Sequence, residues 1–559
     1  MIEEIYNIGN VIRNLEGNKP LVELWTKDTK ALDNILVINI NEKTKKIDKE
    51  VLDFYEDAYK DCLIYQQGNG HVGAGIKIEN YKDKDSESIK NKKLMSALSF
   101  MEIDKSYLEE AWNVIEKEIK KDIKQSYLIM INKNNKNARE LYQSKYDTKI
   151  KETYLISNKK LQKEIKESTC HLCGKISKTY DTAIYKCFTN DKEIYSNTQG
   201  YTFSVCEDCM YSLLHGRNYI NENLKVIWIG SEVMFLPHEF NEDIKNIYET
   251  SIDKENKITN LLRNVRALEG EVLKKIAKSH CITDIVFFSD PKASSEWKIT
   301  YDIRDILPTR FGKLGSLIEK YKSVDGYFSI YKIMSYLCYS DGKLDSKNKD
   351  RMRLLDILFK GKNYSRTIFF NKVMNKYKIE YLKNDNKAHL TLRDIHEIYN
   401  FIGECGCLKN PWKLINEEGE LMKYKDREEF FEINKEFFDN NVKKAWFIIG
   451  QIYNQTIYQS KNYKAIDKEN ISQESSHLEK SFFFSKKFDY TTFIDFANLC
   501  SEKLRKYNAY YPSIREDLNT AKEYMSNGKI KLNNDEAKYI FFWGMDMWFD
   551  KDTNEEEQR

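Results

Sequence analysis

The hydrophobic pattern of the first half of the chain switches between short apolar runs and helical spacing. Residues 35–40 form an apolar run that predicts a strand, and residues 154–158 predict another short strand. Apolar residues at helical spacing predict a helix over 51–63 and an amphipathic helix over 107–124. This mixture of periodicities predicts an α+β fold for the N-terminal region.

The second half of the chain becomes almost wholly helical. Residues 257–279 have helical spacing, 282–288 predict a buried strand, and 297–303 are expected to pair with it. Residues 305–310 predict a turn into a helix, and beyond residue 328 helical periodicity is interrupted only by short polar breaks. The long helical segments include 445–460, 493–506 and 514–525.

Composition is that of a folded chain with large solvated surfaces. The 559 residues are 41% hydrophobic and 32% charged, with six prolines and 22 glycines. Those values exclude a disordered chain, and the absence of an internal repeat argues against a solenoid. We find no signal peptide at the N-terminus and no apolar run of membrane-spanning length, so we expect a cytoplasmic protein. Its eleven cysteines are then expected to be reduced or metal-bound rather than paired in disulfides.

The net charge of +3 says little about nucleic acid, but the charge is unevenly distributed. Residues 117–166 carry 14 Lys or Arg against six Asp or Glu. This segment is either a surface that contacts phosphates or a solvated helix face, and the pattern does not separate the two.

Two cysteine pairs carry the strongest chemical signal. Cys170 and Cys173 form the first pair, and Cys206 and Cys209 form the second. A two-residue gap lets both thiolates of a pair reach one metal from a tight turn, and two such pairs supply the four sulfurs of a tetrahedral zinc site. Four thiolates leave no position for water, so the site is expected to be structural. An iron–sulfur cluster or free thiols are the alternatives.

Three nearby residues could replace one of these ligands but are expected to be bystanders: His171, Cys187 and His215. The spacer between the cysteine pairs is expected to hold a hairpin near 183–188 and 201–203. The expected architecture is therefore α+β, with a mixed N-terminal region, an inserted four-cysteine zinc ribbon and an all-α C-terminal bundle. Its regions are 1–164 (N-terminal α+β), 165–235 (zinc-ribbon insert), 236–327 (α+β continuation) and 328–559 (helical bundle).

Two polar segments are candidates for nucleic-acid contacts. The glycine-rich stretch 68–75 lacks the Lys-Ser/Thr ending of a phosphate-binding loop, which excludes a nucleotide site of that kind. The amides of Gln66, Gln67 and Asn69 beside it could contact bases or phosphates, unless the stretch is a plain hairpin turn.

A second candidate combines basic and aromatic residues, which suits a single strand because bases stack while phosphates pair with cations. The basic residues are Lys292, Lys298, Arg304 and Arg310, near Trp297 and Tyr301. An edge hairpin with a solvated face is the alternative. We find no catalytic motif, and therefore expect a protein that is not an enzyme.

The order of the motifs is specific. CysXXCysGly at 170–174 is followed by Phe-Ser-Val-Cys-Glu-Asp-Cys at 203–209, Leu-Leu-His-Gly-Arg at 213–217 and Ile-Trp-Ile-Gly at 227–230. Phe-Ser-Asp at 288–290, Ile-Leu-Pro-Thr-Arg at 306–310 and Ala-Trp-Phe-Ile-Ile-Gly at 445–450 come later. In this order the chain resembles the large-subunit family of the subtype I-B CRISPR interference complex, Cascade.

The resemblance implies a non-catalytic DNA-recognition scaffold. Such a subunit lies near the 5′ end of the CRISPR RNA, recognises the protospacer-adjacent motif in target duplex DNA, helps to form the R-loop and holds the displaced strand. The implied partners are CRISPR RNA, Cascade backbone subunits, a small subunit and a helicase-nuclease. Sequence specificity then comes from RNA–DNA pairing, as in other RNA-guided effectors.

The small subunit is sometimes made from an internal start in the large-subunit gene. Glu418-Gly419-Glu420 precedes Met422 and can be encoded by a purine-rich ribosome-binding sequence, so a product of 138 residues starting at Met422 is expected. Two other classes of function compete with the scaffold: a metal-dependent nuclease with a zinc ribbon, and an RNA-binding protein that works alone.

Overall fold

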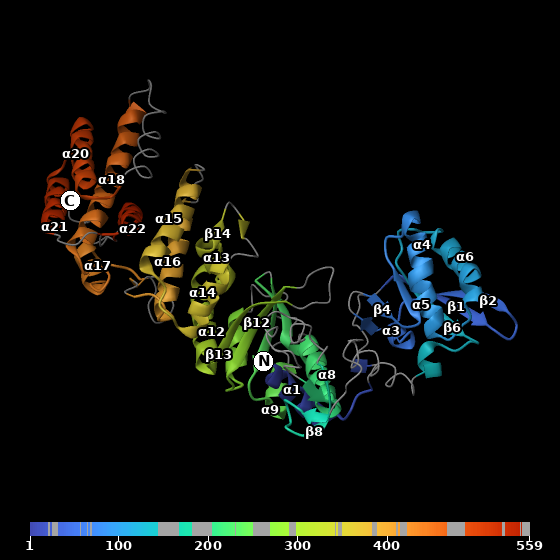
Figure 1. The fold of residues 1–559 in the computed structure, drawn as a ribbon. Helices are drawn as coiled ribbons and strands as arrows, with labels where there is room; N and C mark the ends of the chain where they lie inside the picture. Colours follow the sequence, from blue (N-terminus) through green and yellow to red (C-terminus); the bar gives the residue numbers. More distant parts are fainter. Residues whose placement is uncertain are drawn as a thin grey trace. The chain divides into compact units, whose positions relative to one another are not determined.

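The computed structural model describes residues 1–20, 23–24, 32–55, 57–63, 65–67, 70–142, 167–181, 204–229, 231–249, 269–289, 298–340, 343–344, 349–382, 388–409, 412–413, 422–466, 487–527, 532–547 and 549. The chain divides into two units, and Figure 1 labels many of the helices and strands of both. Unit 1 comprises Met1–Thr259 and Ile282–Arg304, and unit 2 comprises Asn260–Cys281 and Asp305–Arg559. No helix in the described ranges is both long and apolar enough to cross a membrane.

A four-stranded sheet organises the first part of unit 1. Its strand order is β2 (Lys46–Asp53), β1 (Asn34–Asn41), β6 (Tyr127–Lys133) and β5 (Gly75–Ile78). The two central strands pair in parallel, and each is a nearly continuous apolar run, as expected for strands that are covered on both faces. The strand expected at 35–40 is therefore confirmed.

The helix expected over 51–63 is wrong in its first half. Residues Lys46–Asp53 form strand β2, and only Ala58–Asp61 form a short helix, α3. Residues 51–53 are a strand because they pair with β1. Val51 lies opposite Leu36, and Leu52 packs against the sheet's hydrophobic core. Tertiary pairing overrides a local apolar spacing that was compatible with a helix.

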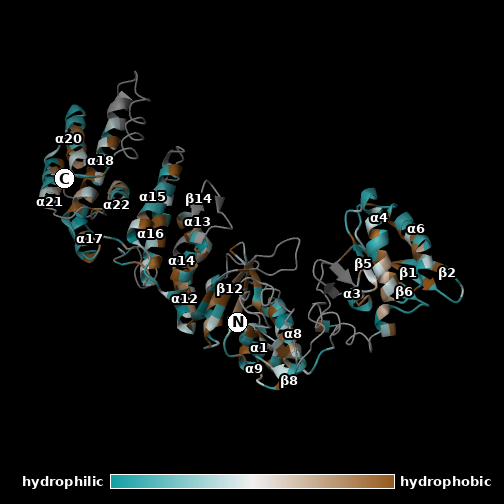
Figure 2. Ribbon diagram, in the orientation of Figure 1, coloured by the Kyte–Doolittle hydropathy of each residue, from teal (hydrophilic) through white to brown (hydrophobic). Residues whose placement is uncertain are grey.

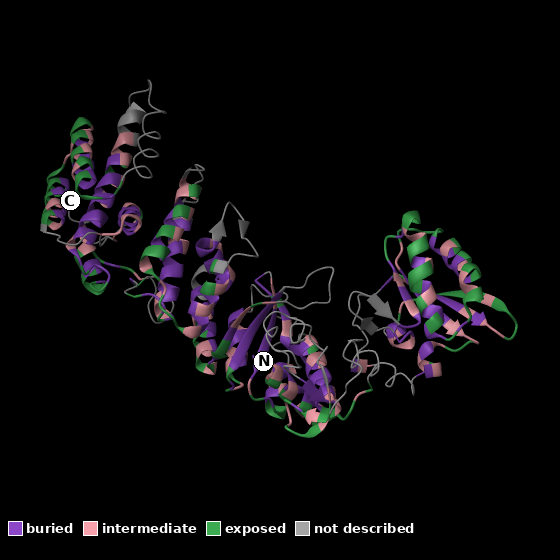
Figure 3. Ribbon diagram, in the orientation of Figure 1, coloured by how far each residue is buried: buried purple, intermediate pink, exposed green. Residues whose placement is uncertain are grey.

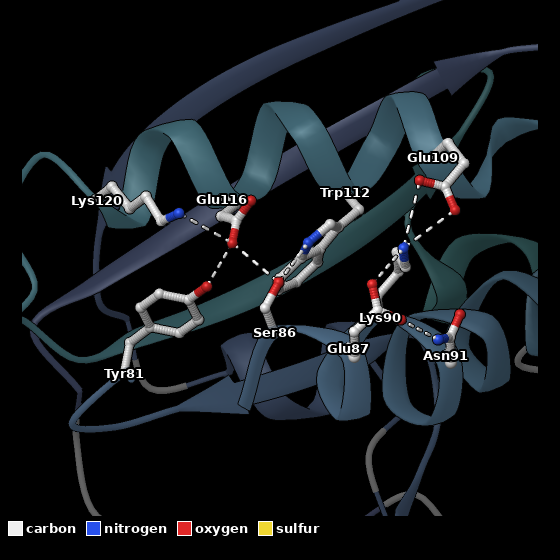
Figure 4. A network of polar contacts seen from close by, with 9 residues as sticks. All are labelled: Tyr81, Ser86, Glu87, Lys90, Asn91, Glu109, Trp112, Glu116 and Lys120. Atoms are coloured by element: carbon white, nitrogen blue, oxygen red, sulfur yellow. Dashed lines mark hydrogen bonds and ion pairs between the residues drawn. The ribbon is translucent and has the colours of Figure 1, made fainter. Parts of the chain in front are cut away.

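A polar network fixes the helices of this part (Figure 4). Helix α6 (Leu108–Ile119) presents Trp112 and Glu116 to Ser86, whose hydroxyl donates to Glu116 Oε1 at 2.9 Å and accepts from Trp112 Nε1 at 3.1 Å. Tyr81 adds a hydrogen bond of 2.6 Å to the same carboxylate oxygen. These bonds anchor α6 to α4 (Ser86–Ser88), the π-helical turn η2 (Ile89–Leu94) and α5 (Met95–Phe100) that follow.

The second part of unit 1 combines helix α1 (Ile2–Glu16) with a segment that begins at residue 167. Its first sheet has the order β7 (Glu167–Thr169), β8 (Ile176–Asp181) and β9 (Ser204–Cys206), and its second has the order β10 (Lys225–Trp228), β11 (Ser231–Pro237), β12 (Thr283–Ser289) and β13 (Lys298–Ile306). Between the sheets lie α8 (Glu207–Tyr219) and the π-helical turn η7 (Ile220–Leu224) in sequence, and α9 (Glu242–Glu249) follows β11. The paired strands expected near 282–288 and 297–303 are confirmed as β12 and β13.

Helices α1 and α8 cross with their backbones in contact. A Cβ on Gly9 would lie 1.6 Å from the carbonyl oxygen of Ser212, and one on Gly216 would lie 2.0 Å from that of Ile5. Glycine is therefore required on both sides of the crossing. The same device recurs in unit 2, where Gly450 faces Phe541 and Gly544 faces Phe447.

Unit 2 is helical apart from the two-residue strands β14 (Tyr339–Ser340) and β15 (Lys343–Leu344), as far as its described segments go. Its helices are α11 (Glu269–Ala277), α12 (Pro308–Asp325), α13 (Ile330–Leu337), α14 (Lys349–Lys360), α15 (Arg366–Leu382), α16 (Ala388–Glu404), α17 (Arg427–Ile433), α18 (Asn441–Ile466), α20 (Tyr490–Lys506), α21 (Pro512–Asn527) and α22 (Asn534–Asp546). The expected C-terminal helices are thus present, but the helical unit already includes α11 and α12, before residue 328.

Helix α22 forms the centre of the C-terminal core. Its residues from Glu536 to Gly544 are all buried, and it packs against α15, α16 and α18. Helices α20 and α21 instead have one buried and one exposed side (Figure 3), which matches their division into hydrophobic and hydrophilic residues (Figure 2). Amphipathic outer helices around a wholly buried one explain why the sequence shows clear helical periodicity here.

The buried His396 makes this core sensitive to acid. It lies 2.6 Å from the Tyr539 hydroxyl and 3.1 Å from Asn400 Nδ2. Burial holds the pKa of His396 well below its ordinary value, so below pH about 6.5 the unfolded chain binds a proton that the folded chain does not. The contribution of neutral His396 to the free energy of unfolding is then fully present above pH about 6.5. On acidification the free energy of unfolding falls by at most about 1.4 kcal/mol per pH unit.

We expect His396→Gln to reduce this acid sensitivity, although it costs stability at every pH. Urea unfolding of both proteins, followed by tryptophan fluorescence at pH 7 and pH 5, measures the difference. Trp412 and Trp543 lie 4.2 and 4.8 Å from the imidazole, between ring centroids, and report on this core. An equal loss of stability on acidification in both proteins would contradict the prediction.

Candidate metal centre

The four predicted cysteine ligands converge in the three-stranded sheet of unit 1. Cys170 and Cys173 lie in the turn between β7 and β8, Cys206 ends β9, and Cys209 lies in the first turn of α8. Strand β9 pairs with β8 so that Thr179 lies opposite Cys206, which brings the second cysteine pair to the first. Local turns form each pair, and strand pairing joins the pairs.

The first pair forms a tight knuckle. Cys170 N–H donates to the Lys175 carbonyl at 2.8 Å, and Gly174 N–H donates to the Cys170 carbonyl at 2.9 Å. Gly174 has φ 71°, in the left-handed region that glycine adopts without strain. This explains the glycine directly after the second cysteine, which turns the chain back into β8.

The sulfur positions fit a tetrahedral metal ion. All four sulfur atoms lie within 4.8 Å of one another, and those of Cys173 and Cys206 are 3.7 Å apart. Zinc–sulfur bonds of about 2.3 Å in a tetrahedron place the sulfurs about 3.8 Å apart. All four cysteines are free thiols, and three of them are buried. The cluster is close enough to bind a metal ion and is compatible with zinc.

The electrostatics also favour a cation. Burial raises the pKa of the Cys170 thiol, but backbone N–H groups of Cys173, Cys206 and Leu172 outweigh burial and bring the pKa down to about 6. Burial raises the pKa of Cys206 and of Cys209, and neighbouring thiols raise the pKa of Cys209 further. The Cys170 thiolate is therefore stabilised by the backbone, whereas a positive ion would be needed to favour ionisation of Cys206 and Cys209.

Helix α1 covers this centre, an arrangement that no sequence pattern predicted. The Arg13 guanidinium donates to Asp208 Oδ1 at 2.8 Å, to the Asp208 carbonyl at 2.9 Å and to Ser212 Oγ at 2.7 Å. Burial and a hydrogen bond with Cys209 raise the pKa of Tyr6 to about 12. These contacts join residues about two hundred positions apart, so no local spacing could have signalled them.

The bystander residues lie off the cluster or outside the described ranges. His171 Nδ1 lies 2.9 Å from the Ser204 carbonyl oxygen and accepts from Ser204 N–H at 3.0 Å, which fixes the ring to the backbone. His215 is buried further along α8 and does not join the four sulfurs. Cys187 and the hairpin expected at 183–188 and 201–203 lie outside the residues that the structure describes.

The glycine-rich stretch lies within a hairpin. Strands β3 (Tyr65–Gln67) and β4 (Gly70–Val72) pair antiparallel, with Gln67 opposite Gly70. Gln66 and Gln67 belong to β3, but their side chains are not described, and Asn69 lies outside the described residues. Their contact with nucleic acid stays a prediction.

The basic segment 117–166 is described up to residue 142. Several of its basic side chains there form ion pairs with acidic neighbours. Lys120 lies 3.2 Å from Asp83, Lys121 lies 2.9 Å from Glu118, and Lys133 lies 3.0 Å from Glu42. These pairs favour the solvated-surface interpretation for this part of the segment.

The basic residues near Trp297 and Tyr301 have different surroundings. Lys292 lies outside the described ranges, and the side chain of Lys298, the first residue of β13, is not described. Arg304 is exposed on β13 and pairs with Asp302. In contrast, the guanidinium of Arg310 bonds inside unit 2, at 2.5 Å to the Leu358 carbonyl, 2.7 Å to the Cys405 carbonyl and 3.1 Å to Cys407 Sγ.

We expect Arg310 to act in packing rather than in nucleic-acid binding. Arg310→Gln removes the guanidinium donors of the Leu358 and Cys405 carbonyls and should cost unit 2 about 2 kcal/mol. Arg304→Gln is the matched control, because an exposed ion pair contributes at most about 1 kcal/mol. Thermal unfolding of both variants measures the difference. Lost nucleic-acid affinity at unchanged stability in Arg310→Gln would instead support the role predicted from the sequence.

Comparison with known families gives two matches. The central domain of CRISPR-associated protein TM1802 matches residues 167–306, which include all four clustered cysteines and both sheets around them. The C-terminal domain of the same protein matches residues 328–559, the greater part of the helical unit. No curated protein matches the chain. Because the two matches together span more than half of its length, the chain belongs to the family of CRISPR-associated protein TM1802.

Proposed function

We propose that the chain is the non-catalytic large subunit of a type I-B Cascade complex in the cytoplasm. In this role it recognises the protospacer-adjacent motif in target duplex DNA, assists R-loop formation, binds the displaced strand and docks the helicase-nuclease. The observation that carries the proposal is the pair of family matches, which flank and include the motifs on which the resemblance to the I-B large subunit rests. CRISPR RNA and the backbone subunits are the partners that hold it in place.

We propose further that the metal is zinc and that it serves structure. Four thiolates complete a tetrahedral shell, so no water can bind to the ion and be activated for hydrolysis. The centre ties the sheet of β7, β8 and β9 to the start of α8. A scaffold that has to hold duplex DNA in register gains from such a rigid joint.

The proposed small subunit corresponds to residues from Met422 onward. Helices α18, α20, α21 and α22 pack on one another within this segment, which supports a separate folded product. In the full chain, α22 also contacts α15, and Glu536 pairs with Arg366. A separate product would expose this face of α22, which would then be available to a neighbouring subunit.

The test is copurification. The tagged chain is co-expressed with its neighbouring genes and a CRISPR array, with and without Met422→Leu. We expect a particle that contains CRISPR RNA, a backbone subunit and a species of the mass of residues 422–559, and we expect the substitution to remove that species alone. A chain that purifies without RNA or backbone subunits would exclude the scaffold role.

A second cluster of possible metal ligands supports a test of the alternative function, a metal-dependent nuclease. Ligand atoms of Glu4, His238 and Asp284 lie within 4.8 Å of one another, and His238 Nε2 lies 2.8 Å from Asp284 Oδ1. Two carboxylates and an imidazole could hold a divalent ion for hydrolysis. Magnesium- or manganese-dependent cleavage of DNA by the purified chain, lost in His238→Ala, would favour that function over the scaffold.

A further inference from the structure

A cavity of about 160 Å³ lies beside the C-terminal half of α8, apart from the four cysteines. Its lining includes Ile12 and Glu16 from α1, His215 and Tyr219 from α8, and Lys245 from α9. One enclosed water needs roughly 10–15 Å³, so the cavity has room for on the order of ten heavy atoms, the size of one heterocyclic ring system.

The least expected residue of the lining is His215. Its side chain is only 1% exposed, and neither ring nitrogen has a hydrogen-bond partner among the described residues. Burial lowers the pKa of His215 to about 4, so at neutral pH the ring is uncharged and carries one N–H donor and one acceptor. Buried polar groups almost always have a hydrogen-bond partner. The unpaired nitrogens of His215 therefore indicate that a bound molecule supplies the partner.

Two further features accompany this histidine. The hydroxyl of Tyr219, one turn further along α8, is also buried in this lining, where Glu249 is its polar neighbour. Helix α8 then continues into the π-helical turn η7, which contributes Glu222 and Asn223 to the lining. A π-helical turn departs from ordinary helix geometry and frequently occurs at a functional site.

The charges of the cavity favour a neutral ligand. Lys19 lies 2.9 Å from Glu16, and Lys245 lies 3.4 Å from Glu16 and 3.0 Å from Glu249. Each ammonium group is already paired with a carboxylate, and the third carboxylate of the lining, Glu222, accepts from Asn218 Nδ2 at 3.1 Å. A phosphate would therefore find no uncompensated positive charge here and would be repelled by the carboxylates. A planar, uncharged ring with hydrogen-bonding edges avoids this repulsion and suits the unpaired nitrogens of His215.

We propose that this cavity takes up a single nucleobase from a strand that the chain holds. The inference rests on the proposed function, since the displaced strand supplies the base. An unstacked base is recognised by hydrogen bonds to its edge and by contact with aromatic side chains. His215 supplies the hydrogen bond after rotation about its Cβ–Cγ bond, which exchanges the positions of ring carbon and nitrogen atoms. The Tyr219 hydroxyl supplies a second bond.

The test compares a single-stranded oligonucleotide with an abasic strand of the same length, by fluorescence anisotropy on the purified full chain. We expect the strand with bases to bind about tenfold more tightly, since one well-held base is sufficient for a difference of that size. His215→Phe, which fills the cavity with an apolar ring, should abolish the difference and leave abasic binding unchanged. Photocrosslinking of 4-thiothymidine in the strand should label a peptide that contains residues 215–223.

The controls separate the cavity from general folding effects. Tyr219→Phe should weaken binding of the strand with bases, whereas Tyr248→Phe, a buried tyrosine on α9 outside the lining, should not. Equal binding of both strands with crosslinks elsewhere would overturn the base pocket and leave the proposed function standing. No binding of either strand, by the free chain or by the assembled particle, would overturn both. A His215→Phe protein that is more stable and binds as before would identify a packing defect and exclude a ligand site.

Discussion

Replacing Cys209 with alanine is expected to remove the metal ion and to unfold the centre around it. Three remaining thiolates cannot complete the tetrahedron, and in small structural zinc sites metal binding contributes about 10–16 kcal/mol that is coupled to folding. Elemental analysis of the purified variant should fall from about one zinc ion per chain to well below half an ion. Because Cys209 lies in the first turn of α8, hydrogen exchange in α8 and β9 should accelerate at the same time.

The control for this experiment is Cys500→Ala. Cys500 is another buried thiol, located in α20 and away from the cluster, so its loss should leave the zinc content unchanged. Chelation of the wild-type chain should reproduce the exchange pattern of Cys209→Ala, and acidification should release the ion because protons compete for the sulfurs. A Cys209→Ala protein that retains a full equivalent of zinc would show that the four sulfurs are not the ligands.

Replacing Gly9 of α1 with alanine should disturb the packing of α1 on α8, next to the four cysteines. In Gly9→Ala the new Cβ would lie 1.6 Å from the Ser212 carbonyl oxygen, a distance that no side-chain rotation can relieve. The two helices have to separate, and we expect a loss of about 3 kcal/mol, at the upper end for overpacking. The hydrogen bonds from Arg13 to Asp208 and Ser212 should weaken with the shift.

Hydrogen exchange measured by mass spectrometry can follow this displacement peptide by peptide, without treating the unfolding of the whole chain as one transition. Peptides from α1 and α8 should exchange faster in Gly9→Ala, and the helical unit should be unaffected. Gly312→Ala is the matched control, because there the new methyl meets Ala277 Cβ at 3.4 Å, an ordinary contact. Similar effects of the two substitutions would refute the backbone contact between α1 and α8.

Sequence periodicity predicted the elements whose burial is regular. Strand β1 and strand β12 are continuous apolar runs, and the outer helices α20 and α21 have a single buried face. The failure over 51–63 has a different cause, since strand β2 is exposed along most of its length and carries almost no pattern. Its conformation is decided by pairing with β1, which is information that the local sequence does not hold.

The cysteine cluster could be predicted because each half of it is local. Two residues between cysteines fix a knuckle wherever the chain folds, and only the approach of the two knuckles depends on the sheet. Tyr6 and Arg13 could not be predicted, because their partners are chosen by the packing of α1 on α8. The contacts of Arg310 were equally hidden from the sequence: a basic residue beside aromatic ones predicts nucleic-acid binding, and only the fold shows that its guanidinium donates to carbonyl groups of unit 2.

Because α1 packs on α8, the domain boundaries of unit 1 do not follow the order of the chain. Helix α1 and the segment from residue 167 build one folding module, whereas the sheet β2-β1-β6-β5 lies between them in sequence with its own core. Residues 34–142 are thus an insertion domain within a discontinuous parent, and the family match that starts at residue 167 omits the parent's first helix. A fragment cut at that boundary would expose Gly216 and the helix face around it. Exchanging residues 34–142 for another domain while leaving α1 in place is therefore expected to preserve the parent module.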